Sequence, residues 1–307
     1  MPGRTIRILE TAQEMVAVEQ LQRLVWPGDD TEIVPLHLLV TAAHNGGLVI
    51  GAYDEVSQEG DTGPLVGFVF GFPGLYFTPD GPRPKHCSHM LAVHPGYRDR
   101  GIGFALKRAQ WQMVRHQQLD LITWTYDPLQ SRNAYLNIAK LGAVCNRYRR
   151  EVYGEMRDGL NVGMPSDRFE VDWWVNTKRV ERRLSRRARR QLDLAHFLSA
   201  EAAIINPTRT GSNGLPLPAD SEAVIAGLKT KMDAKREKDD VFLLVEIPAD
   251  IQQIKAVDTG LALAWRAHTR DLFEFSFSRG YLVTDTVYLP GPQPRSFYVL
   301  SHGESTL

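Results

Sequence analysis

The sequence has 307 residues, of which 43% are apolar and 23% are charged, so it describes an ordinary globular protein with enough chain for a sizeable core or two domains. Its formal net charge is zero, which gives no electrostatic reason to expect nucleic acid or an anionic membrane as a partner. Two cysteines are too few for a disulfide framework, and no apolar run forms a signal peptide or reaches the roughly 18 residues of a membrane span, so we expect a cytoplasmic protein with reduced thiols.

The first part of the chain predicts a strand, two helices and a hairpin. Thr11 is suited to cap a helix, because Glu14 follows it at the spacing of a capping box. The glycines and prolines of 71–83 predict a loop that covers part of a site. The predicted elements are a strand at 5–9, a helix after Thr11, a shorter helix at 35–44, and strands at 48–53 and 64–72 joined by a polar loop at 54–63.

The next stretch, 86–118, predicts a strand, a basic glycine-rich turn and a helix. The strand covers 86–93, and the helix follows the glycines at 101 and 103. The first N–H groups of a helix lack internal partners and its dipole favours negative charge, so this helix start is suited to an anion. Glycines let the anion approach the backbone, and Arg98 and Arg100 add charge-assisted hydrogen bonds. The predicted apolar face of the helix consists of Ile102, Leu106, Ala109 and Met113.

The remaining chain predicts further helices and strands. Gly142 stands where a glycine ends a helix in the C′ position. Strands are expected at 121–125, 143–153, 169–175, 241–247, 281–288 and 297–300. Helices are expected at 129–141, 177–190, 221–238 and 250–277, and a linker or surface loop at 206–219.

The stretch around the basic turn resembles motif A of the GNAT acyltransferases, in which the amides of the turn hold the pyrophosphate of acyl-CoA. The competing Rossmann fingerprint requires Gly-x-Gly-x-x-Gly directly after a strand, whereas Leu106 occupies the third glycine position here and a basic turn intervenes. The resemblance is carried by a strand that ends in Val93-x-Pro95, by Tyr97-Arg98, and by the pattern Arg98-x-x-Gly101-x-Gly103.

The segment 131–143 resembles motif B of the same family, whose consensus is Asn-x-x-Ala-x-x-x-Tyr-x-Lys-x-Gly-Phe. Ala134, Lys140 and Gly142 match this consensus in register. Ser131 stands at the position of the family's Asn, and Ile138 stands at the position of its Tyr. That Tyr is the usual acid for the departing CoA thiolate, so the substitution puts the role in doubt here. An amphipathic helix with a glycine cap explains the local pattern equally well.

The resemblance covers about residues 5–178 and implies the GNAT acyl-CoA N-acyltransferase fold, of the α/β (α+β) class, with a mixed and mostly antiparallel sheet flanked by helices. We expect a GNAT domain at 1–176 and a C-terminal α/β extension at 177–307, which is either a degenerate GNAT half or a dimerisation element. In this fold, strands 90–93 and 121–125 splay apart and leave backbone amides free for the pantetheine arm. The residues implied to bind the acyl-CoA cosubstrate are Leu91, Ala92, Val93, Arg98, Asp99, Arg100, Gly101, Ile102, Gly103, Ser131 and Asn133.

Acyl transfer to an amine requires a neutral amine, donors for the thioester oxygen and help for the thiolate. His89 is the candidate base, because histidine titrates near neutral pH, with a hydrogen-bonded structural histidine as the alternative. His86 precedes it by three strand positions and therefore faces the other side of the sheet. Asp127 is a candidate for binding the acceptor ammonium, with a turn and helix-cap role as the alternative. Tyr135 and Tyr153 are the nearest candidates for a replacement acid, and no metal is part of this hypothesis.

Two features of the C-terminal part bear on partners. The helix at 177–190 is strongly basic, which favours an amphipathic helix with a solvated cationic face over a contact for acidic protein or CoA phosphates. One long helix over a few apolar strands leaves apolar surface that another sheet or subunit must cover. We therefore expect this segment to dock on the GNAT domain or on a second copy of itself, and a homodimer is the natural closed solution.

Together these features predict an acyl-CoA-dependent N-acyltransferase. Its partners are acetyl-CoA or another acyl-CoA and a small-molecule amine, with an amino acid and N-succinylation among the options. Two alternatives from other classes stay open: a catalytically silent acyl-CoA sensor, which the missing motif B Tyr favours, and an assembly protein that uses the basic helix and the extension.

Overall fold

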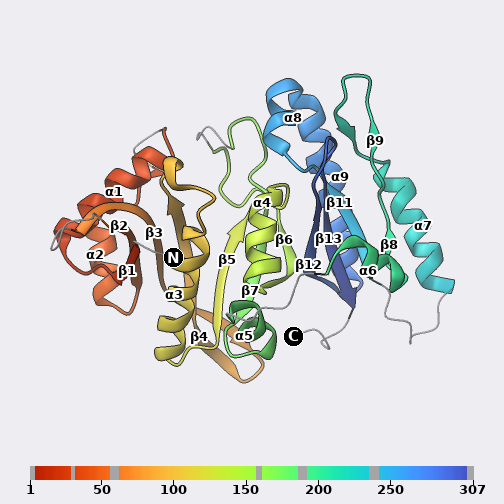
Figure 1. The fold of residues 1–307 in the computed structure, drawn as a ribbon. Helices are drawn as coiled ribbons and strands as arrows, with labels where there is room; N and C mark the ends of the chain where they lie inside the picture. Colours follow the sequence, from red (N-terminus) through yellow and green to blue (C-terminus); the bar gives the residue numbers. More distant parts are fainter. Residues whose placement is uncertain are drawn as a thin grey trace. The chain divides into compact units, whose positions relative to one another are not determined.

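The computed structural model describes residues 4–28, 32–55, 62–156, 161–185, 192–234 and 242–302 (Figure 1). The chain divides into two compact units. Unit 1 comprises Met1–Trp124, Arg157–Val162 and Asp172–Asn176, and unit 2 comprises Thr125–Met156, Gly163–Val171 and Thr177–Leu307. The expected domain boundary at residue 176 stays a prediction. In the described residues, no helix is both long and apolar enough to cross a membrane.

Unit 1 contains the predicted strand, two helices, hairpin and strand–turn–helix. The capping box of Thr11 and Glu14 at the start of α1 is confirmed. Its sheet order is β1-β2-β3-β4-β5, with antiparallel pairs throughout except for the parallel pair β4–β5. The elements are β1 (Arg4–Ile8), α1 (Ala12–Val25), α2 (Leu36–His44), β2 (Leu48–Glu55), β3 (Thr62–Thr78), β4 (Gly81–Val93), the 3-10 turn η2 (Pro95–Tyr97), α3 (Ile102–His116) and β5 (Leu121–Tyr126), whose last residues belong to unit 2.

Different helices cover the two faces of the unit 1 sheet. Phe68 of β3 is buried in a hydrophobic cluster with Met15 of α1 and with residues of α2. The preceding residue, Gly67, lies on the other face, where a side chain would meet Ile102 and Leu106 of α3. Because successive side chains of a strand point to opposite faces, α1 and α2 cover one face and α3 covers the other.

Strands β3 and β4 continue beyond their neighbours as a two-stranded arm. The composition of 71–83 predicted a loop, and this prediction is wrong, because both strands run through it. Pro82 and Pro84 stand opposite residues of β3. The prolines are tolerated here because β4 pairs with β5 only at His86 and Cys87, so no further strand requires their missing N–H groups.

Unit 2 contains motif B, the end of the predicted GNAT domain and most of the C-terminal extension. Its sheet order is β6-β12-β13-β11-β8, antiparallel except for the pair β11–β8. The elements are α4 (Ser131–Ala134), the π-helix η3 (Tyr135–Lys140), β6 (Val144–Arg149), β7 (Arg168–Trp174), whose last residues belong to unit 1, α5 (Lys178–Leu184), α6 (Leu194–Ser199), β8 (Ala203–Ile204), β9 (Arg209–Thr210), β10 (Pro216–Leu217), α7 (Ser221–Ala234), β11 (Leu243–Ile247), α8 (Ile251–Val257), α9 (Thr259–Ser278), β12 (Tyr281–Leu289) and β13 (Arg295–His302). The mixed, mostly antiparallel sheet flanked by helices is thus confirmed as the fold class.

Three predictions for unit 2 need correction. The long helix at 250–277 is two helices, because Asp258 adopts an extended backbone and its carboxylate caps α9 at Leu261 N–H. The loop at 206–219 contains the short hairpin β9–β10. The motif B helix begins at Ser131 rather than 129 and becomes a π-helix, although Gly142 does end it with a φ of 79°.

The basic helix is also shorter than predicted, and part of its cationic face is bonded rather than solvated. Helix α5 ends at Leu184, and 186–191 lie outside the described residues. Arg179 donates to the carbonyl oxygens of Gly142 and Thr284. Arg183 donates to the Asp285 carboxylate at 2.6 Å. These arginines bind α5 to other segments of unit 2 instead of facing an external partner.

The core of unit 2 joins the end of the predicted GNAT domain to the extension. The fully buried ring of Phe169 on β7 packs edge-on against Phe273 of α9 at 4.7 Å between centroids. It also packs against Tyr298 of β13 at 5.4 Å. Strand β6 pairs with β12 at Cys145 and Val283. Residues before and after 176 therefore share one hydrophobic core.

We predict that a chain truncated after Asn176 does not fold as a stable protein. The truncation exposes Phe169 and leaves the β6 edge unpaired, and exposed aromatic side chains with open strand edges promote aggregation. Size-exclusion chromatography with light scattering should show soluble aggregates for the truncated chain only. A monodisperse truncated protein with a cooperative thermal transition would contradict the shared core.

Candidate functional site

The basic turn between β4 and α3 holds its glycines and arginines in the geometry of an anion site. Gly101 precedes α3 in the left-handed conformation, with a φ of 76°, and Asp99 adopts a φ of 64°. The first helical hydrogen bond runs from Ala105 N–H to Gly101 O at 3.1 Å. The N–H groups of Ile102 and Gly103 precede that bond and point out of the helix start. This arrangement favours a bound anion.

The charged side chains of the turn lie at the surface around this helix start. Arg98 and Arg100 are both exposed. The Arg100 guanidinium lies over the Tyr97 ring at 4.9 Å, and its carbonyl accepts a hydrogen bond from Arg4 at 2.9 Å. His94 Nδ1 accepts from Gly96 N–H at 3.1 Å and fixes the start of the turn. The predicted turn residues are therefore gathered in one place.

Strands β4 and β5 part at the level of Ser88. Their parallel ladder consists of the pairs His86–Ile122 and Cys87–Thr123, although β4 continues to Val93. His94 N–H donates to Val66 O of β3 at 2.9 Å. Since alternate amides of a strand point the same way, those of Leu91 and Val93 point away from β3, toward the open side. These are the amides that the resemblance assigns to the pantetheine arm.

His89 sits at an irregularity of β4 on the face covered by α1 and α2. The register of β3 and β4 shifts there, because Phe70 pairs with Met90 and Gly71 pairs with Ser88. His89 is therefore the extra residue of a β-bulge. Its partly exposed ring lies 6.0 Å from the Phe70 ring and 5.9 Å from the Phe72 ring. Partial burial lowers its pKa, which favours the neutral imidazole that a general base requires.

His86 faces the opposite side of the sheet, as predicted from its spacing. It is fully buried, and its Nε2 lies 3.1 Å from Gln110 Nε2 of α3. Burial, reinforced by the nearby Lys107 ammonium, lowers its pKa to about 3. The ring is therefore neutral, accepts from the Gln110 amide and carries its proton on Nδ1.

The polar cluster next to His86 could not be predicted from the sequence. Lys107 of α3 is 2% exposed, and its ammonium donates to Ser88 Oγ at 2.8 Å and to Gln110 Oε1 at 3.1 Å. The same ammonium lies over the Trp124 ring at 3.7 Å. The buried face of α3 was predicted to contain Ala109 and Met113, but it consists of Ile102, Leu106, Lys107, Gln110 and Val114. Hydropathy gives no signal for buried lysine and glutamine.

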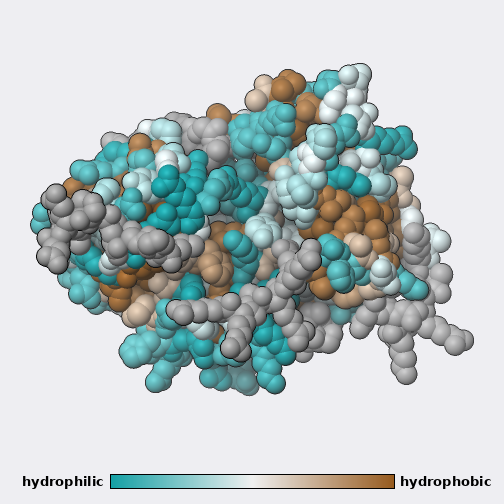
Figure 2. Space-filling view, in the orientation of Figure 1, coloured by the Kyte–Doolittle hydropathy of each residue, from teal (hydrophilic) through white to brown (hydrophobic). Residues whose placement is uncertain are grey.

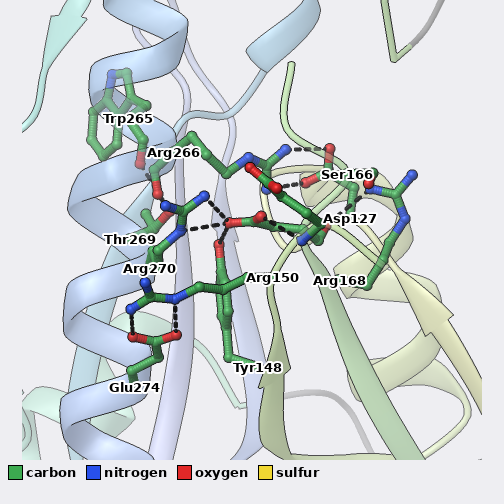
Figure 3. A network of polar contacts seen from close by, with 12 residues as sticks. Asp127, Tyr148, Arg150, Ser166, Arg168, Trp265, Arg266, Thr269, Arg270 and Glu274 are labelled. Atoms are coloured by element: carbon green, nitrogen blue, oxygen red, sulfur yellow. Dashed lines mark hydrogen bonds and ion pairs between the residues drawn. The ribbon is translucent and has the colours of Figure 1, made fainter. Parts of the chain in front are cut away.

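Asp127, the candidate for binding an acceptor ammonium, has an arginine partner in unit 2. Its carboxylate accepts two hydrogen bonds from Arg266 of α9, at 2.8 and 2.7 Å (Figure 3). It accepts a third from Leu129 N–H at 2.8 Å. Burial lowers the pKa of the Arg266 guanidinium, but the Asp127 charge more than offsets this and raises it. The carboxylate thus serves as a turn aspartate neutralised by arginine, whereas the N-cap of α4 is Gln130, and the role of Asp127 in acceptor binding stays a prediction.

A second carboxylate in unit 2 is bound in the same way. Asp167 is fully buried and accepts from Arg270 of α9 and from the Tyr148 hydroxyl, both at 2.8 Å (Figure 3). Although burial alone raises the pKa of Asp167, these donors lower it. Helix α9 therefore presents two arginines to two aspartates, and neither arginine was singled out from the sequence.

The motif B residues lie in unit 2, beside a cavity. Ser131 and Tyr135 line a cavity of about 650 Å³, together with residues of β12. The Ser131 hydroxyl donates to Ser296 Oγ at 2.8 Å, and Asn133 is exposed. Ile138, at the position of the family's Tyr, is fully buried, so it is a core residue of η3. Among the described residues, no group of three or more His, Cys, Asp or Glu side chains could hold a metal ion.

No family model matches the sequence, and no curated protein matches it. Solved structures similar to this chain include NAA60 of Arabidopsis thaliana in complex with acetyl-CoA, at 18% identity over 56% of this chain and 99% of that one, with a TM-score of 0.44. A putative acetyltransferase of the GNAT family from Desulfovibrio desulfuricans is 18% identical over 56% of this chain and 99% of that one, with a TM-score of 0.41. The IAA acetyltransferase of Bacillus cereus is 14% identical over the same shares, with a TM-score of 0.39. At these TM-scores the likeness adds no argument for function, which rests on β4, the turn and α3.

We predict that Arg266→Met lowers the free energy of unfolding by about 3–5 kcal/mol, because it leaves the Asp127 carboxylate, whose side chain is only 12% exposed, without its counter-charge. Urea unfolding followed by circular dichroism measures this. Adding Asp127→Asn to the same chain should restore part of the loss.

Arg150→Met is the matched control for this prediction. It removes the exposed ion pair of Arg150 with Glu274, also of α9 (Figure 3). Exposed ion pairs contribute little to stability, so the urea concentration at the midpoint of unfolding should hardly change. Equal losses of unfolding free energy for the two substitutions would show that burial does not determine how much the Arg266–Asp127 pair stabilises the protein.

Proposed function

We propose that this protein is an acyl-CoA-dependent N-acyltransferase of the GNAT type, which transfers an acyl group from a CoA thioester to the amine of a small molecule. The observation that carries the proposal is the parting of β4 from β5 at Ser88, followed by a basic glycine turn that caps α3. The parting supplies unpaired strand amides for the pantetheine arm, and the turn that follows supplies an anion site for the pyrophosphate.

Residues of unit 1 take the binding roles in this proposal. The pyrophosphate lies against the N–H groups of Ile102 and Gly103, with Arg98 and Arg100 as exposed counter-charges. The pantetheine arm takes its hydrogen bonds from the backbone of Leu91 and Val93. Asp99, Gly101 and Ala92 shape the turn and strand. The roles expected for Ser131, Asn133, Asp127 and Tyr135 of unit 2 stay predictions.

In the proposed reaction, the amine nitrogen attacks the thioester carbonyl carbon and forms a C–N bond. The C–S bond breaks, and its electron pair leaves on the CoA sulfur as a thiolate, which then takes up a proton to give CoA thiol. The proton lost by the amine passes to His89, which its lowered pKa keeps neutral at pH 7 and ready to accept it. The products are the N-acyl amine and CoA.

The acyl group and the acceptor define the finer part of the proposal. We propose an amino acid as the acceptor and a succinyl group as one of the acyl groups transferred. The experiment that tests them is thiol release from a panel of acyl-CoAs, including acetyl-CoA and succinyl-CoA, against amino acids, polyamines and peptides. Binding without turnover across the panel would favour the second candidate function, a silent acyl-CoA sensor, for which the observation is the buried Ile138 at the position of the family's acid.

For the C-terminal extension we propose a degenerate GNAT half. The order β11-β13-β12 repeats the order β5-β7-β6, and in both cases helical segments join the first strand to the next one in sequence, α8 and α9 in one and α4–η3 in the other. Homodimer formation also stays a proposal. It is supported by the hydrophobic side chains gathered over the part of unit 2 where β11 and β13 lie (Figures 1 and 2). Light scattering of the full chain tests it.

We predict that Gly103→Asp weakens CoA binding at least tenfold, because it adds bulk and like charge where the pyrophosphate is expected. Isothermal titration of CoA measures the affinity. The matched control is Gly227→Asp on α7, which adds the same carboxylate to a helix position with open space around it. Unchanged affinity in a folded Gly103→Asp protein would remove the turn from the binding site.

We predict that His89→Ala lowers kcat by about 10²–10⁴ while the affinity for acyl-CoA changes little, because a base acts in the transition state. In the wild type, kcat should fall as the pH drops through the lowered pKa of His89, below the usual 6.5 for histidine, because protonation removes the base. Stopped thiol-release assays between pH 5 and 8 measure both effects. A kcat equal to that of the wild type would exclude His89 from the mechanism.

A further inference from the structure

Among the residues that the structure describes, the buried ammonium of Lys107 has no carboxylate partner. Its ammonium is bonded to the neutral groups Ser88 Oγ and Gln110 Oε1 and faces the Trp124 ring, and Trp173 of β7 lies 5.7 Å away. Arg266, by contrast, pairs with Asp127. Burying a cation without an anion is costly, so a lysine held in this way calls for an explanation.

The position of the ammonium supplies the explanation. Ser88 is the first residue of β4 beyond the ladder with β5, and Trp124 is the first residue of β5 beyond it. Lys107 contacts both side chains, so its charge lies across the point where the two strands part. The wall around it is formed by Trp124 and Trp173, whose rings meet edge-on at 5.7 Å and limit the access of water. All of these residues belong to unit 1.

We propose that the Lys107 ammonium stabilises the negative charge that develops on the thioester during acyl transfer. This inference rests on the proposed function, since it places the thioester end of acyl-CoA at the parting of β4 and β5. The C–S electron pair leaves on sulfur beside the ammonium, the amine proton goes to the general base, and Lys107 keeps its own protons. The ammonium thereby stabilises the departing thiolate, which Ile138 cannot do at the position of the motif B Tyr.

The surroundings fix this charge in place and leave it unscreened. Two hydrogen bonds and the indole face hold the ammonium, so no reorganisation is needed when negative charge appears. In a buried site, a charge acts with far more strength than at the surface. The titratable group that faces it from β4 is His86, which is neutral; Gln110 faces it from α3, and Trp124 and Trp173 face it from β5 and β7. The charge of the buried ammonium therefore matches a transient anion.

The same burial makes the charge sensitive to pH. Desolvation lowers the pKa of Lys107 to about 7. The ammonium is the active form, so its contribution is present below pH 7 and is lost as the pH rises through about 7. The base His89 acts in the opposite direction, since it must lose its proton. Together they give a bell-shaped dependence of kcat/KM on pH.

The test compares Lys107→Met with the wild type, using acetyl-CoA as donor and the fastest amine of the panel as acceptor. Methionine keeps the length and apolar stem of lysine without its charge. We expect kcat to fall about 10²-fold near pH 6.5. The affinity for acetyl-CoA should change less than threefold, and the falling limb of kcat/KM above pH 7 should disappear. Lys229→Met, at an exposed lysine of α7, is the control and should change neither rate nor profile.

Tryptophan emission of the full chain without ligand gives an independent readout. A charged ammonium 3.7 Å from the Trp124 ring should alter its emission, with a midpoint near pH 7 that is absent in Lys107→Met. Identical emission of the two proteins at every pH between 6 and 9 would show that no charge lies there and would overturn the proposal. If Lys107→Met does not fold, a wild-type kcat/KM that rises without a falling limb to pH 9 overturns it instead.

The failure of this inference can be told from failure of the proposed function. Wild-type protein that neither binds acetyl-CoA nor releases thiol with any donor refutes the proposed function, whatever the emission shows. Wild-type protein that turns over, beside a folded Lys107→Met protein with the same kcat and the same pH profile, refutes only the role of Lys107.

Discussion

The candidate site depends on one constraint, the interruption of the parallel ladder between β4 and β5 after Cys87 and Thr123. From Ser88 on, β4 bonds to β3 alone, and the bulge at His89 adds a residue on that side. Buried strand amides without partners are costly, so a sheet keeps such an opening only where something else satisfies or uses them. The strand amides, the helix start of α3 and His89 all lie at or next to this opening, so one ligand could contact all three.

Much of this site follows from local sequence. The strand, the glycine turn and the helix start are encoded within 86–118, where left-handed positions require glycine and a helix start attracts anions. The arm at 71–83 was missed because proline and glycine signal a loop in most sheets, whereas here β4 has an edge with no neighbour. Lys107 was missed for a different reason: hydropathy assigns lysine to water, and only the packing of α3 on β4 places it inside.

The ion pairs of unit 2 join residues far apart in the chain and could not be predicted from local sequence. Asp127 and Arg266 are 139 residues apart, and a bidentate pair over that separation leaves no trace in the local pattern of either segment. Asp127 reads as a turn residue because it is one, through Leu129 N–H, and its second task appears only when α9 is in place. The same holds for Asp167 and Arg270. The acceptor role expected for Asp127 rested on its position after a strand, and position alone does not reveal a distant partner.

Among the buried cations of the described residues, Arg266 and Lys107 offset the cost of burial in opposite ways. Arg266 keeps its charge at every accessible pH, and a carboxylate neutralises it permanently, which suits a structural contact between α9 and the segment after β5. Burial lowers the pKa of Lys107 to about 7, and its hydrogen-bond partners Ser88 and Gln110 are neutral, so it exists in both forms around neutral pH. A structural contact gains nothing from a charge that comes and goes. A site where negative charge appears and disappears in each turnover does gain from it, because the ammonium is not already neutralised when that charge forms.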